Sequence, residues 1–251
     1  MEFAVLIQAR LGSSRYPEKI LKKIDHRSII EYMIDQILKI LPRNTIIINT
    51  TSSKKDDLLV KEIKQKKISI FRGSELNVLS RYIKCAKKFN VKNIIHLTSD
   101  CPLVDINLIL KMKKIFLNKK IDYLANTYPP DKSTFPDGTD IEIYKYQSLL
   151  KLQKLSNLDE DKEHVTNFFW KNKKIFKTKI IKNQKNLSSF KYSVDYKNEV
   201  TLLRGILKIL KKEKIKPNFE NIVKIIKSKK NFYKISNTNL KKFKLNRKDL
   251  Y

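Results

Sequence analysis

The sequence predicts an α/β fold, a three-layer sandwich with helices on both sides of a mostly parallel sheet. Short apolar runs that resemble buried strands alternate with longer segments of helical period. This alternation is typical of βαβ units, which build parallel sheets. A chain of 251 residues with 41% hydrophobic content is also long and apolar enough to bury such a core.

The first half of the chain carries the regular alternation. The expected strands span residues 3 to 8, 45 to 50, 68 to 71, 93 to 97 and 121 to 125. Helices fit between them near residues 28 to 40, 55 to 66, 76 to 90 and 105 to 117. In a parallel sheet, ligands bind beyond the carboxyl ends of the strands, so the loops that follow the strands are the places to look for chemistry.

The pattern changes after residue 125. A polar, proline-bearing connection covers residues 126 to 138, a half-buried strand is expected at 139 to 144, and helical segments lie near 145 to 155 and 162 to 171. We interpret residues 126 to 175 as an insertion over the binding crevice. The later elements are strands at 176 to 181 and 192 to 194 and helices at 198 to 212 and 219 to 226, followed by a Lys-rich tail without clear period. The expected division is a domain over residues 1 to 214 and a basic C-terminal piece over 215 to 251.

The formal charge of +30 raises the question of a nucleic-acid partner. Eight of the 55 basic residues are Arg, and the Lys residues are spread along every expected helix instead of clustering on one motif. That distribution is typical of solvated helix faces. We therefore do not expect a nucleic-acid partner, although a positive field would attract anionic substrates.

The cysteines and the hydropathy indicate the cellular compartment. Cys85 and Cys101 form no C-x-x-C pair, so the sequence indicates neither a disulfide framework nor a zinc site. No stretch is long enough for a membrane span, and the apolar run at the start ends at Arg10, too early for a secretory signal. A cytoplasmic protein that does not bind membranes is expected.

The loop after the first strand is the strongest functional signal. Gly12 allows close backbone approach, Ser13 and Ser14 offer hydroxyl and amide groups, and three cations can neutralise a polyphosphate: Arg10, Arg15 and Lys19. The loop matches neither G-x-x-x-x-G-K-[ST] nor G-x-G-x-x-G. The alternative is a solvated basic turn.

Two acids follow expected strands at the same edge of the sheet. Asp100 comes just after the strand at 93 to 97, and Asp195 ends the strand at 192 to 194. Asp105 lies where it would cap the next helix. For Asp100 the alternative is an ordinary turn residue before Pro102.

Six motifs in order resemble the cytidylyltransferases that activate sugars as CMP conjugates, in particular the subgroup named after a spore coat polysaccharide biosynthesis protein, with acylneuraminate and KDO cytidylyltransferases as relatives. Residues 7 to 19 read IQARLGSSRYPEK and resemble the family's I-Q-A-R-x-G-S-S-R-L-P-G-K. The others are FRGSE (71 to 75) with VLSRY (78 to 82), TSDCPL (98 to 103), FPDGTDIE (135 to 142), EHVT (163 to 166) and SVD (193 to 195). Tyr16, Glu18 and Ser99 depart from the family's Leu, Gly and Gly, and Glu18 puts a negative charge into the phosphate loop.

The resemblance implies a Rossmann-like sheet of the nucleotide-diphospho-sugar transferase type and transfer of CMP from CTP to a sugar or sugar acid, with release of pyrophosphate. It implies that Arg10, Arg15 and Lys19 are catalytic and that Asp100 and Asp195 bind Mg²⁺. The implied nucleotide-binding residues are Gln8, Ala9, Gly12, Ser13, Ser14, Arg72, Ser74 and Arg81. It also implies pairing of two chains through the inserted region.

Acceptor recognition falls to the inserted region. Asp137, Asp140 and Glu142 can bond sugar hydroxyls or an amino group, and their sign argues against a sialic-type acid as acceptor. His164 can reach the same pocket or can be a packed or surface histidine. Arg72, Ser74 and Arg81 can equally be ordinary residues at the rim of the crevice.

Two other classes of function remain open. One is a different nucleotidyltransferase on the same scaffold, or a glycosyltransferase that uses a preformed nucleotide sugar, because fold does not fix function. The other is a noncatalytic basic module for RNA or acidic polymers. That module needs an aromatic-lined basic face, whereas the aromatic residues here fall mostly at positions that favour burial.

Overall fold

The main sheet is seven-stranded and nearly all parallel. The computed structural model describes residues 1–118, 120–156 and 165–245. The sheet has the order β5-β4-β1-β6-β8-β7-β9, and β2 and β3 form a separate hairpin. The strands are β1 (Phe3–Gln8), β2 (Lys23–Ile24), β3 (Arg27–Ser28), β4 (Ile46–Thr51), β5 (Ser69–Gly73), β6 (Asn93–Thr98), β7 (Tyr123–Ala125), β8 (Glu142–Lys145) and β9 (Thr178–Ile180). Every strand of the main sheet except β8 runs in the same direction.

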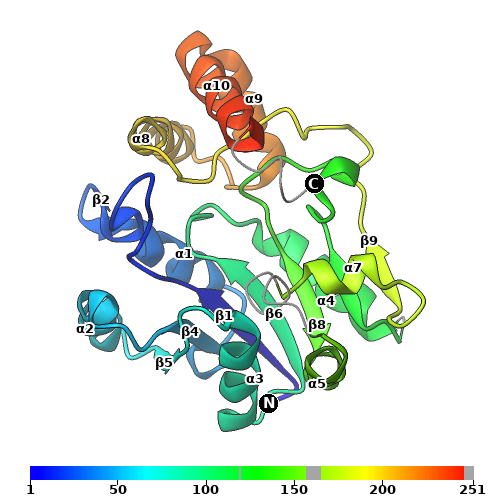
Figure 1. Cartoon of the computed structure of the whole chain (residues 1–251). Coiled ribbons are helices and arrows are strands. Elements are labelled where there is room, and N and C mark those ends of the chain that lie inside the picture. The colour runs from blue at the N-terminus through cyan, green and yellow to red at the C-terminus, as the bar shows by residue number, and fades with distance from the viewer. Residues whose placement is uncertain (119, 157–164, 246–251) are drawn as a thin grey trace.

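Helices cover both faces of this sheet, which confirms the predicted three-layer arrangement (Figure 1). They are α1 (Ile29–Ile37), α2 (Asp57–Gln65), α3 (Val78–Lys88), α4 (Ile106–Asn118), α5 (Tyr146–Leu155), α7 (Asn167–Lys171), α8 (Lys197–Lys212), α9 (Phe219–Ser228) and α10 (Lys230–Leu245). Helices α1, α2 and α4 pack on one face, and α3, α5 and α7 on the other. None of the helices in the described ranges is both long and apolar enough to cross a membrane.

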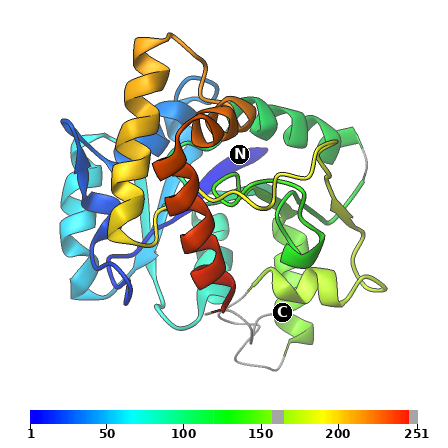
Figure 2. The same cartoon turned by 90° about the horizontal axis from the view of Figure 1, so that it is seen from above.

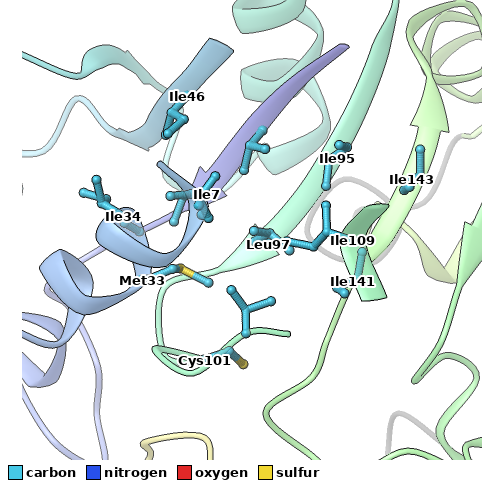
Figure 3. Close-up of a cluster of buried hydrophobic side chains, with 14 of the residues drawn as sticks. Ile7, Met33, Ile34, Ile46, Ile95, Leu97, Cys101, Ile109, Ile141 and Ile143 are labelled. Carbon is cyan, nitrogen blue, oxygen red and sulfur yellow. The ribbon is translucent and has the colours of Figure 1, made fainter. Parts of the chain in front are cut away.

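The alternation of side chains along β1 explains the two cores. Phe3, Val5 and Ile7 face the cluster with α1 and α4, whereas Ala4 and Leu6 face the cluster with α3. Because both faces are covered, β1 reads as a continuous apolar run. Figure 3 shows part of the first cluster, in which Ile7 and Leu97 lie close to the side chains of α1.

Strand β8 belongs to the main sheet. Residues 139 to 144 were expected within a region lying over the crevice, but β8 is inserted antiparallel between β6 and β7. Its register places Glu142 beside His96 of β6. A single alternating strand can pair with the sheet or lie over it, and the alternation does not distinguish the two. The division into residues 1 to 214 and 215 to 251 stays a prediction.

The strand expected at residues 192 to 194 is absent, and an isolated bridge between Asp137 and Lys191 is all that remains of it. The backbone there bonds to neighbouring loops: the Tyr192 N–H donates to the Asp137 carbonyl (2.9 Å) and the Val194 N–H to the Asp100 carbonyl (2.8 Å). The segment is nevertheless buried, with Tyr192 2% and Val194 0% exposed. Their partners, however, are loops. The Val194 bond brings Asp195 next to Asp100.

The tail also differs from expectation, because residues 230–245 form the regular helix α10. Its buried positions include Ser236, Asn239 and Leu240. Two of these three are polar, so the helical period is hard to see in hydropathy. The polar groups are satisfied by partners far away in sequence: Ser236 Oγ accepts the Lys191 N–H (2.8 Å), and Asn239 Nδ2 donates to Asn198 Oδ1 (2.8 Å).

Candidate active site

The loop after β1 is anchored by a buried carboxylate. Asp56 Oδ1 accepts the Leu11 N–H (2.7 Å), and Oδ2 accepts from the Thr50 hydroxyl (3.1 Å) and the Thr51 N–H (3.3 Å). Asp56 is 2% exposed. Because a buried carboxylate with several donors has one favourable position, it fixes where the loop starts. Sequence reasoning missed Asp56, and the available signal was an acid at the start of the helix expected near residues 55 to 66.

A cavity of about 240 Å³ lies between this loop and the end of β6. Most of the residues predicted to bind nucleotide, phosphate or metal line it. They are Gln8, Arg10, Gly12, Ser13, Ser14, Arg15, Lys19, Asp100 and Asp195. Ala9 is buried beside them. The cavity, which we call the loop cavity, therefore lies at the carboxyl edge of the parallel strands, where binding was expected.

Lys19 joins the two aspartates. Its Nζ lies 2.8 Å from Asp100 Oδ2 and 2.9 Å from Asp195 Oδ1. Arg15 Nη2 lies 2.7 Å from the same Asp195 oxygen. Two acids 95 positions apart in sequence thus converge on the ammonium group of Lys19, which follows the loop after β1. The sequence placed Asp100 and Asp195 at the same edge of the sheet, and the structure brings them together.

Behind Asp195 lies a buried lysine that sequence reasoning missed. Lys191 Nζ is 3.0 Å from Asp195 Oδ2, 3.2 Å from Glu199 Oε1 and 3.7 Å from Asp137 Oδ1, and its side chain is 0% exposed. Burying an ammonium group without partners is very costly, and three carboxylates offset that cost. The available signal was a lysine between two buried aromatic residues, Phe190 and Tyr192.

The pKa values follow from this charge network. Burial opposes the charged form of Lys19, but the carboxylates of Asp100 and Asp195 outweigh it and raise the Lys19 pKa. Burial also opposes ionisation of Asp195, yet the neighbouring cations, Lys191 first, hold its pKa well below the usual range. Asp100 behaves likewise, with burial opposed mainly by Lys19 and a lowered pKa. Both aspartates are therefore ionised at neutral pH.

A second group of cavities, which we call the acceptor cavities, lies on the other side of Asp100 and Asp195. Two cavities of about 70 Å³ each share the side chains of Asp137 and Asp140, and Glu142 lines one of them. Gly138 allows this loop to turn, because its φ is +113° and a Cβ there would lie 2.7 Å from the Tyr192 ring. The structure thus brings these three predicted acids together next to the loop cavity.

Besides the buried Ala9, three predicted nucleotide-binding residues do not line the loop cavity. Arg72 donates to the carbonyls of Thr51 (2.9 Å) and Ser53 (2.8 Å). Ser74 Oγ accepts the N–H of Asn77, and its carbonyl accepts from Arg81. These contacts hold β5 and the start of α3 in place. His164 lies outside the described residues.

Glu18 adopts the left-handed conformation that usually favours glycine, with φ +54°. This explains why glycine occurs there in the family pattern. The side chain is 51% exposed and lies 3.5 Å from Lys22 Nζ, so the negative charge points away from the loop cavity.

The comparisons with known proteins identify a nucleotidyltransferase. A family model described as cytidylyltransferase matches residues 4–242, and the chain belongs to this family. An uncharacterized protein of Methanocaldococcus jannaschii, MJ1063, is 31% identical over 177 residues, 70% of each chain. Spore coat polysaccharide biosynthesis protein SpsF of Bacillus subtilis is 25% identical over 208 residues, 80% of this chain and 84% of that one.

The solved structures agree with the family match. A cytidylyltransferase from Leptospira borgpetersenii is 28% identical, covers 92% of this chain and 96% of its own, and superposes with a TM-score of 0.85. This agreement covers nearly the whole length of both chains.

The donor set at the site fits a hard divalent cation. No group of three or more His, Cys, Asp or Glu side chains in the described part of the chain is arranged to hold a metal. Asp100 and Asp195 nevertheless converge on one cation, the Lys19 ammonium. Mg²⁺ commonly binds through one or two carboxylates, with substrate phosphate oxygens and water as its other ligands. Two converging carboxylates beside a cation-lined loop meet that requirement.

Proposed function

We propose that this protein transfers CMP from CTP to a sugar or sugar-acid acceptor, releases pyrophosphate and depends on Mg²⁺. In this reaction an acceptor hydroxyl oxygen forms a bond to the α-phosphorus while the bond from that phosphorus to the leaving pyrophosphate breaks. The hydroxyl proton is lost to solvent. Membership of the cytidylyltransferase family supports the nucleotide class, and the similarity to a polysaccharide biosynthesis protein supports a sugar acceptor.

The observation that carries the proposal is the position of Lys19. Its ammonium group bridges Asp100 and Asp195 at the wall of the loop cavity. Arg10, Arg15 and Lys19 would hold the β- and γ-phosphates of CTP and stabilise the charge that develops on pyrophosphate. Such charge stabilisation is where phosphoryl-type transfer gains most of its rate.

Asp100 and Asp195 would hold Mg²⁺. When bound, the metal neutralises the α-phosphate and orients the attack. Asp195 would keep its position because Lys191 and Arg15 bond to it independently of Lys19. The protein would act in the cytoplasm and would pair with a second copy through residues 126 to 175.

The test is pyrophosphate release. The purified chain is incubated with CTP, UTP, GTP or ATP, with Mg²⁺ or EDTA, and with a panel of nonulosonic acids and amino sugars. We expect release with CTP and Mg²⁺ and none with EDTA. Release with another nucleotide would instead indicate a different nucleotidyltransferase. No release in any combination, together with tight RNA binding, would contradict the enzyme assignment.

A matched pair of lysine variants sharpens this test. Lys19→Met should lower turnover by about 100-fold or more, the typical loss when one charge-stabilising donor is removed. Lys22→Met is the control, because Lys22 lies in the same segment, does not line the loop cavity, has a side chain that is 39% exposed and pairs only weakly with Glu18. Equal activity of the two variants would remove Lys19 from the mechanism.

A further inference from the structure

Helix α10 is fixed against the body of the enzyme by several contacts. Phe232 packs where Gly205 of α8 has no side chain, and a Cβ at that position would overlap the ring. The Phe190 and Tyr233 rings meet edge to face, with centroids 6.1 Å apart. Together with the bonds of Ser236 and Asn239, these contacts give α10 a defined position. Figure 2 shows α10 (red) crossing this end of the molecule, between the N-terminal half and the green segment.

The last turn of α10 reaches the acceptor cavities. Leu240 and Lys244 line one of them, and Phe243 lines both. The Phe243 ring centroid lies 5.3 Å from Lys191 Nζ and 5.7 Å from Arg15 Cζ. The Phe243 ring therefore packs near Lys191 and Arg15, two of the cations that contact Asp195, on the side that faces the acceptor cavities.

The opposite wall is acidic and poor in cations. Asp137 and Asp140 line both acceptor cavities, and Lys244 is the one Lys or Arg among the described residues that line either of them. Asp140 accepts the Gly138 N–H (2.9 Å) and makes no ion pair with any described residue. Burial raises the pKa of Asp140, and it raises that of Asp137 to about 6. An incoming cation would favour the ionised form of both acids.

His96 is the second sign that a polar ligand binds here. It is 9% exposed, it lines one acceptor cavity, and neither ring nitrogen makes a hydrogen bond to a described residue. Its Nδ1 lies 3.3 Å from Glu142 Oε1. Buried polar groups are normally satisfied, so a polar ligand in the cavity would remove this deficit.

We propose that Asp137, Asp140 and Phe243 form an acceptor subsite for a sugar that carries a free amino group and no carboxylate. The inference rests on the proposed function and narrows its acceptor. The ammonium and hydroxyl groups donate to the two aspartates, while the apolar face of the ring packs on Phe243. A sugar acid would place its carboxylate beside Asp137 and Asp140, where the exposed Lys244 is the one Lys or Arg among the described lining residues, and the like charges of the two acids disfavour it.

The experiment measures acceptor binding without turnover. The protein is saturated with Mg²⁺ and α,β-methylene-CTP, and sugars are titrated in by calorimetry. The probes are glucosamine and mannosamine, their neutral counterparts glucose and mannose, and the acids 3-deoxy-manno-octulosonate and N-acetylneuraminate. We expect an amino sugar to bind more tightly than its neutral counterpart and the acids not to bind. Asp140→Asn should abolish the preference for the amino sugar.

Phe243→Ala should weaken amino-sugar binding by about tenfold, since an aromatic contact has about that effect, without changing binding of the CTP analogue. Leu245→Ala is the matched control, because Leu245 is in the same turn of α10 and is 60% exposed. Binding of a sugar acid, binding of no sugar at all, or equal effects of the two variants would overturn the subsite while leaving the proposed function standing. Failure of wild-type protein to bind the CTP analogue would overturn the proposed function, and the subsite with it.

Discussion

The loop cavity and one of the acceptor cavities share the side chains of Asp100 and Asp195, yet opposite charges line the two sides. Arg10, Arg15 and Lys19 face the loop cavity, whereas acids and an aromatic ring face the acceptor cavities. A triphosphate and an amino-bearing acceptor would be drawn to different sides of the same two aspartates. The difference suggests that charge alone can sort two substrates within one crevice.

The largest effect is expected when the two shared acids, Asp100 and Asp195, are neutralised. Asp100→Asn and Asp195→Asn should each lower Mg²⁺-dependent pyrophosphate release by about 100-fold or more, because each change would remove one of the two carboxylates proposed to hold the metal. The assay is run on protein whose folding has been checked by circular dichroism. Near-normal activity in both variants would remove these residues from the mechanism.

The same two variants should differ in stability. Asp195 is 3% exposed in its side chain and bonds to three cations, while Asp100 is 26% exposed and bonds to one. We therefore expect Asp195→Asn to cost more free energy of unfolding than Asp100→Asn.

The next largest effect is expected when the buried cation Lys191 is removed. Lys191→Met leaves Asp195 and Glu199 buried without their shared partner and should lower the free energy of unfolding by about 3 to 5 kcal/mol, as when one member of a buried ion pair is deleted. Urea denaturation measures the change. Lys185→Met, at an exposed lysine nearby, is the control. Similar stabilities of the two variants would show that the buried lysine contributes nothing.

The acidic side should also give a pH signature. Asp137 has a pKa of about 6 in the folded chain against an ordinary value of 3.8, so the folded state holds this proton to higher pH than the unfolded state. Unfolding between those values releases a proton, and the contribution of Asp137 to stability therefore falls as pH rises from about 4 to about 6 and is constant above.

Asp137→Asn removes this titration. The stability of wild type relative to the variant should decrease across that pH range in urea denaturation at a series of pH values. Asp131→Asn, at an exposed position, should show no such trend. A constant difference between wild type and Asp137→Asn would contradict the raised pKa.

The smallest expected effect is in the phosphate loop itself. Glu18→Gly should stabilise the protein by up to about 1 kcal/mol, because the left-handed backbone at residue 18 is strained for a residue with a Cβ. Thermal denaturation measures the gain. Loss of the surface ion pair between Glu18 and Lys22 offsets little of it. A loss of stability would mean that the glutamate side chain supports the loop more than its exposure indicates.

Sequence reasoning succeeded where function sits next to regular structure. The strand before Arg10 and the strand before Asp100 are apolar and continuous, so their ends could be located and the loops placed at one edge of the sheet. The family match and the similar solved structure confirm the family resemblance and the overall architecture.

Sequence reasoning failed where buried contacts are made by polar groups. Lys191 is buried by carboxylates, and α10 docks through Ser236 and Asn239. Hydropathy treats all of these residues as solvated. Their partners lie 41 to 45 positions away for the two α10 residues, so no local pattern reveals them. Phe243 was missed because its neighbours Arg15 and Lys191 are also far away in sequence.

The close approach of α8 and α10 has one more consequence. A single added methyl group at residue 205 would have to push Phe232 aside and carry the far end of α10 with it. All the groups proposed to contact nucleotide or sugar would survive such a change, yet the shape of the acceptor cavities would differ. Selectivity in this enzyme can thus evolve through a position that no substrate ever touches.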